Sequence, residues 1–115
     1  CVLLGVGHSA LGERYLIGPI LRMDGLPRIL GDVAQTRTVL RFAWHLTSLL
    51  WWGIAAVLAY MAAVPAAVSR PLLWMVVIVF GTSGAIALVG TRGAHKSWVY
   101  FFAIAVLAAL AAAGK

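Results

Sequence analysis

Residues 42–64 read FAWHLTSLLWWGIAAVLAYMAAV, a stretch without any acidic residue, lysine or arginine. A helix needs roughly 17–25 predominantly apolar residues to cross the hydrocarbon core of a bilayer, and this stretch is long enough. The apolar residues follow one another without the alternation that is typical of a half-buried strand. We therefore expect a transmembrane helix here.

Three further apolar stretches share this character. Residues 71–89 are long enough to span a bilayer, and residues 98–113 are slightly short but almost entirely apolar. The stretch 1–11 continues as a mixed segment to residue 22, and we expect further residues to precede Cys1 because its start is short. Proline and glycine mark the breaks between stretches. The predicted helices cover residues 1–22, 38–64, 71–91 and 97–113.

The composition supports a membrane location. The chain is 63% hydrophobic and 10% charged, with a mean hydropathy of +1.01. Soluble domains are about half apolar and about a quarter charged, and small ones bury too little of their area to hide so much apolar surface. We therefore predict an all-α integral membrane bundle of about four transmembrane helices, forming a single domain over residues 1–115.

The basic residues predict how this bundle is oriented. Most of them flank the connection after the first helix or lie between the third and fourth helices, whereas Arg70 and Lys115 lie on the other side. Because cytoplasmic loops carry an excess of lysine and arginine, we expect both termini on the non-cytoplasmic side of a multi-pass protein. This topology accounts for the net charge of +6, and no nucleic-acid motif is present. The lipid bilayer is the expected partner. The residues on the cytoplasmic side are Arg14, Arg22, Arg28, Arg37, Arg41, Arg92 and Lys96.

Two histidines are predicted to lie at matched depth near the cytoplasmic face. At 1.5 Å per residue, His8 lies about 7 Å along the first helix from Glu13, and His45 lies about 6 Å along the second helix from Arg41. Ionisable residues inside membrane helices are costly and usually face the bundle, so His8 and His45 can meet. Hydroxyl groups nearby add hydrogen-bonding capacity. They belong to Ser9, Thr47 and Ser48.

This pattern leaves two interpretations open. Histidine is the commonest metal ligand, so His8 and His45 are candidate cofactor-binding residues for haem b, and His8, Glu13 and His45 are candidate ligands for a transition metal. Packed helices lie 8–10 Å apart, so bis-histidine haem ligation would require the two helices to splay or to sit diagonally. The simpler interpretation is that the two histidines are buried hydrogen-bonding residues that tie the helices together, and we favour it.

The sequence does not indicate an enzyme, because it contains no nucleophile–base–acid arrangement and no phosphate-binding loop. We therefore consider three functions. The first is a non-catalytic accessory or assembly subunit that associates with other membrane subunits or with itself, which fits the small-residue surfaces at 81–85 and 103–113. The second is a redox or electron-transfer protein that uses His8 and His45. The third is a small transporter or channel component.

Two segments, HSALGERYLI at residues 8–17 and RFAWHLTS at residues 41–48, also resemble small four-helix proteins of the bacterial inner membrane. The resemblance covers mainly the first half of the chain. It implies a bacterial inner-membrane protein of four helices and implies no activity. It covers the same His8, Glu13, Trp44 and His45 that the depth argument brings together.

Overall fold

The computed structural model describes residues 1–28 and 31–114, and in those ranges it contains helices joined by turns and no strand. The prediction of an all-α fold is therefore confirmed. The chain forms two compact units, divided after Leu58, and each is described by itself. The single domain predicted over residues 1–115 stays a prediction.

The first unit begins with a helix that contains a wide turn. α1 (Val2–Gly12) continues through a π-helical turn (Glu13–Ile17) into α2 (Gly18–Leu21). Pro19 has no N–H group and cannot extend a regular α-helical hydrogen-bond ladder. At Gly18, the N–H group donates to the Glu13 carbonyl, and a Cβ atom there would collide with that carbonyl oxygen. The glycine–proline pair therefore explains why the helix widens after Glu13.

α3 (Val33–Ala63) is the longest helix of the chain, and its residues 33–58 belong to the first unit. It begins earlier than the predicted residue 38, because the Asp32 carboxylate accepts a hydrogen bond of 3.0 Å from the Ala34 N–H group. Such a contact satisfies one of the unpaired donors at a helix start. Residues 33–37, which precede the predicted start, are thus the first part of α3.

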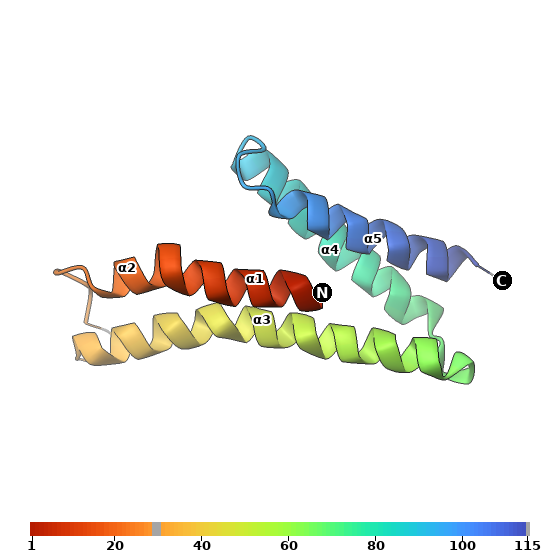
Figure 1. Cartoon of the computed structure of the whole chain (residues 1–115), viewed down its shortest axis with the longest axis horizontal. Coiled ribbons are helices and arrows are strands. Elements are labelled where there is room, and N and C mark those ends of the chain that lie inside the picture. The colour runs from red at the N-terminus through yellow and green to blue at the C-terminus, as the bar shows by residue number, and fades with distance from the viewer. Residues whose placement is uncertain (29–30, 115) are drawn as a thin grey trace. The chain divides into compact units, whose positions relative to one another are not determined.

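α1 and α3 run antiparallel (Figure 1). Their side-chain contacts step along the two helices in opposite directions: Trp52 Nε1 donates to the Val2 carbonyl at 3.3 Å, and Ser48 lies 3.1 Å from His8. At the far end, Arg41 lies 2.8 Å from Glu13. The helix pair therefore has one end rich in charged residues and one that is apolar.

The second unit contains the antiparallel pair α4 (Arg70–Gly90) and α5 (Ser97–Ala113), which follows a short 3-10 turn (Pro65–Ala67). Ser69 caps α4 and Pro71 lies in its first turn. At its two ends, the pair is tied by a hydrogen bond of 2.9 Å from Arg70 to the Gly114 carbonyl and by the turn between the helices. Its buried residues are Leu73, Val76, Phe80 and Gly84 on α4 and Phe101, Ala105, Ala108 and Ala112 on α5.

Glycine brings α4 and α5 close together. A Cβ atom on Gly84 would lie 2.9 Å from the Phe102 ring, whereas a Cβ atom on Gly81 would meet nothing within 4 Å. The small residues predicted to form a packing surface on α4 therefore do not all face α5. Gly84 is used against α5, and Gly81 is left open.

Among the described residues, two helices are long and apolar enough to cross a membrane, namely α3 and α4. α5 is apolar but shorter, and α1 ends at the wide turn after eleven residues. Only 11% of the apolar window of α3 and 22% of that of α4 is buried within the protein. The core helix of a water-soluble protein is mostly buried, so this exposure is consistent with a membrane location.

Candidate functional site

A chain of hydrogen bonds joins α1 to α3, and we call its six residues the polar network: His8, Ser9, Glu13, Arg41, His45 and Ser48. His8 Nδ1 lies 3.1 Å from Ser48 Oγ, and Ser9 Oγ donates to Ser48 Oγ at 2.9 Å. Ser9 Oγ also lies 2.9 Å from His45 Nδ1. The two histidines are thus connected through two serine hydroxyls rather than in direct contact.

The network continues from His45 to the charged end of the helix pair. His45 Nε2 lies 3.3 Å from Glu13 Oε2, and Arg41 Nη2 donates to Glu13 Oε1 at 2.8 Å. Glu13 thereby receives a different partner on each carboxylate oxygen. The wide turn that begins at Glu13 belongs to the same part of the chain, and such turns are frequent at functional sites.

The residues of the polar network on α3 differ in exposure. Ser48 is 1% exposed, whereas the side chains of His45 and Arg41 are 39% and 54% exposed. The network therefore leads from the interior of the helix pair to its charged end. Thr47 does not join it, because its hydroxyl bonds to the Ala43 carbonyl of its own helix.

Tryptophans on α3 hold the His8 imidazole from two directions. The Trp44 ring stacks on it with centroids 4.2 Å apart and an interplanar angle of 11°, and Trp51 meets it edge-on at 5.0 Å. Trp44 Nε1 also donates to the His8 carbonyl at 3.1 Å. These contacts fix both the ring and the backbone of His8.

The two indoles of Trp44 and Trp52 fit against α1 only because glycines face them. A Cβ atom on Gly12 would collide with the Trp44 ring, and one on Gly5 would lie 2.5 Å from Trp52 Nε1. Sequence reasoning did not find this contact. The sequence does show that Gly5 and Gly12 lie two turns apart on one face of α1. A neighbouring helix with large aromatic side chains can approach such a face.

The hydrogen bonds of His8, Glu13 and His45 bear on whether these residues can bind a metal ion or haem. Both ring nitrogens of His45 and the Nδ1 atom of His8 face protein groups. Among the described residues, no group of three His, Cys, Asp or Glu side chains is arranged to hold a metal ion. Metal ligation by His8, Glu13 and His45, and haem binding by His8 and His45, stay predictions.

His95, the third histidine, lies in the turn between α4 and α5. Its Nδ1 atom lies 2.7 Å from Ser97 Oγ, and its backbone N–H group donates to the Thr91 hydroxyl at 3.2 Å. The residue is exposed. His95 therefore helps to order this turn, at the start of α5.

Comparison of the chain with known protein families, with curated proteins and with solved structures gives no match.

Proposed function

We propose that this chain is a polytopic membrane protein of about four transmembrane helices that acts as a non-catalytic subunit of a larger membrane assembly. The observation that carries the proposal is the apolar surface that the helices leave uncovered. Lipid covers such surface in a membrane, and large exposed apolar patches otherwise mark interaction sites. Exposed large residues include Leu49, Leu50 and Val57 on α3, Met75, Ile78 and Ile86 on α4, and Val106, Leu107 and Leu110 on α5.

Helix lengths support the membrane location. From Arg41 to Ala63, α3 rises about 33 Å at 1.5 Å per residue, which matches the hydrocarbon core of about 30 Å. The first turns of α3, before Arg41, would then project beyond the hydrocarbon. α5 is shorter, and local thinning of the bilayer or snorkelling of its flanking residues accommodates such a helix at modest cost.

The charges support an orientation. The charged end of the α1–α3 pair, with Arg22 and Arg41, and the turn that contains Arg92 and Lys96 would face the cytoplasm. Both termini then lie on the opposite side. In this arrangement, the polar network lies near the cytoplasmic face, because Glu13 and Arg41 belong to the charged end.

The polar network fits a linking role better than ligation. Hydrogen bonds between membrane helices contribute about 0.6 kcal/mol each on average, and the network makes several of them between α1 and α3. A cofactor that took a nitrogen of His45 would displace Ser9 or Glu13 from it. A redox protein that uses His8 and His45 is therefore the second candidate, and a small transporter component is the third.

The test is purification of the chain from its native membrane in a mild detergent, followed by mass determination, an absorption spectrum and metal analysis. We expect a complex with other subunits or copies at fixed stoichiometry, with neither a Soret band nor bound metal. A lone monomer would contradict the assembly role. A Soret band or stoichiometric metal that disappears in His45→Ala would favour the redox candidate instead.

A matched pair of variants sharpens this test. At Gly81, an added Cβ atom would meet nothing within 4 Å, and Gly81 with Ala85 forms the small-xxx-small spacing that lets membrane helices approach closely. We expect Gly81→Leu to reduce the associated subunit about tenfold, which corresponds to 1.4 kcal/mol. Val79→Leu, a change at an exposed position of the same helix, serves as the control and should leave the assembly intact.

A further inference from the structure

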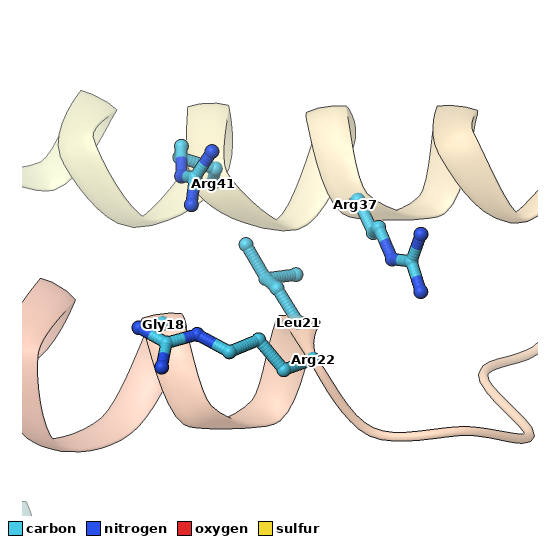
Figure 2. A pocket seen from close by; sticks show the side chains of 5 residues that line it. All are labelled: Gly18, Leu21, Arg22, Arg37 and Arg41. Carbon is cyan, nitrogen blue, oxygen red and sulfur yellow. The ribbon is translucent and has the colours of Figure 1, made fainter.

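A cleft opens at the charged end of the first unit, between α2 and the first turns of α3 (Figure 2). Its volume is about 340 Å³, at the small end of the range for ligand pockets. Three of its five lining residues are arginines. The lining residues are Gly18, Leu21, Arg22, Arg37 and Arg41.

The positive charge in this cleft is only partly balanced. Arg41 is paired with Glu13 at 2.8 Å, whereas neither Arg22 nor Arg37 forms an ion pair with any described residue. Of the three guanidinium groups, that of Arg41 is paired with a carboxylate. Because Arg22 and Arg37 are exposed, their donors are available to an anion from outside the protein.

The backbone and the apolar lining shape the cleft. Gly18 is buried, and a Cβ atom there would lie 3.7 Å from Arg22 Nη2, so the Arg22 guanidinium folds back along α2 over the glycine (Figure 2). Leu21 is 5% exposed and points toward α3 in the same view. The cleft therefore combines a cationic rim with an apolar wall.

We propose that this cleft binds a phosphate-bearing anion, with Arg22 and Arg37 as its direct ligands and Arg41 adding charge from its pair with Glu13. Planar guanidinium groups match phosphate oxygens in bidentate geometry and remain charged at all relevant pH values. The phosphate belongs either to an anionic phospholipid headgroup or to a small soluble compound. Basic pockets at the cytoplasmic side of membrane helices bind anionic headgroups, so a lipid source rests on the membrane location proposed above. The anion site itself does not depend on that location.

The experiment has two arms that use the purified full chain. In the first, the chain is placed in nanodiscs of phosphatidylcholine with or without phosphatidylglycerol, and native mass spectrometry measures the lipid retained. In the second, the chain in a phosphate-free maltoside detergent is titrated calorimetrically with inorganic phosphate. Both arms compare the unaltered chain with the double variant Arg22→Gln/Arg37→Gln, whose helicity is verified by circular dichroism.

The control is the double variant Arg28→Gln/Arg92→Gln, which removes the same charge at exposed positions outside the cleft. Hydrogen bonds from charged groups contribute strongly to binding affinity. We therefore expect the cleft variant to bind the probe at least tenfold more weakly and the control to show little change. Selective loss of phosphatidylglycerol identifies a headgroup, and selective loss of inorganic phosphate identifies a soluble ligand.

Two outcomes would overturn the proposal: an unaltered chain that binds neither probe, or an equal loss in both double variants. Because neither arm depends on a partner subunit, failure of the assembly role and failure of the anion site are distinguishable.

Discussion

Replacing Gly12 by alanine is expected to destabilise the protein by about 2 kcal/mol, within the range for overpacking a tight contact. The added methyl group would collide with the Trp44 ring, and that ring cannot move away freely. It is stacked on His8 and donates to the His8 carbonyl. The change should therefore separate α1 from α3 and disrupt the polar network as well. The free energy of unfolding, measured by SDS titration of the detergent-solubilised chain, checks the prediction.

The same helix provides the control for this experiment. A Cβ atom on Gly7 would meet nothing within 4 Å, so Gly7→Ala adds the same methyl group without a collision. Alanine is a better helix former than glycine, and we expect Gly7→Ala to leave stability unchanged or to raise it by about 0.5 kcal/mol. Equal effects of the two substitutions would show that the glycine–tryptophan contact does not hold the helices together.

Replacing Ser48 by alanine is expected to cost about 2 kcal/mol, because it removes the hydrogen bonds that one buried hydroxyl makes to His8 and Ser9. Ser48 is 1% exposed, and its hydroxyl lies within hydrogen-bonding distance of both His8 Nδ1 and Ser9 Oγ. Its loss interrupts the connection between the two histidines. Unfolding by SDS and the nitrogen-15 NMR signals of the two imidazoles report the energetic and the local effect.

Ser83→Ala is the matched control for Ser48. The Ser83 hydroxyl bonds only to the Val79 carbonyl of its own helix, at 2.8 Å, so its removal leaves no side chain unpaired. We expect a change below about 0.5 kcal/mol, as for substitutions away from such networks. If Ser48→Ala were as mild as this control, the polar network would contribute no stability.

The matched level of the two histidines along α1 and α3 could be predicted from the sequence, but their exact partners could not. Counting residues from Glu13 and from Arg41 placed His8 and His45 at one level, and the structure brings them into one network. Whether two side chains at one level touch depends on how each helix is rotated about its axis. That rotation decides that Ser9 and Ser48 stand between the histidines, and that Thr47 points to its own helix.

Other features depended on local backbone geometry that a hydropathy pattern does not contain. The wide turn after Glu13 follows from the absent N–H group of Pro19 and the absent side chain of Gly18. The early start of α3 follows from one hydrogen bond between Asp32 and Ala34. The Trp44 ring can stack on His8 only because Gly12 faces it. Composition alone does not distinguish such a tryptophan from one that packs in a helix interface.

The most direct test of the central claim is disulfide cross-linking between α1 and α3 within the membrane. The native cysteine is removed by Cys1→Ser, and Ser9→Cys is combined with Ser48→Cys, whose native hydroxyl oxygens lie 2.9 Å apart. A mismatched pair combines Ser9→Cys with Leu49→Cys, an exposed neighbour on α3. In carbonate-washed membranes treated with a mild oxidant, the account predicts rapid closure of the 9–48 pair and little of the 9–49 pair. Equal closure of both pairs, or release of the chain by the carbonate wash, would contradict it.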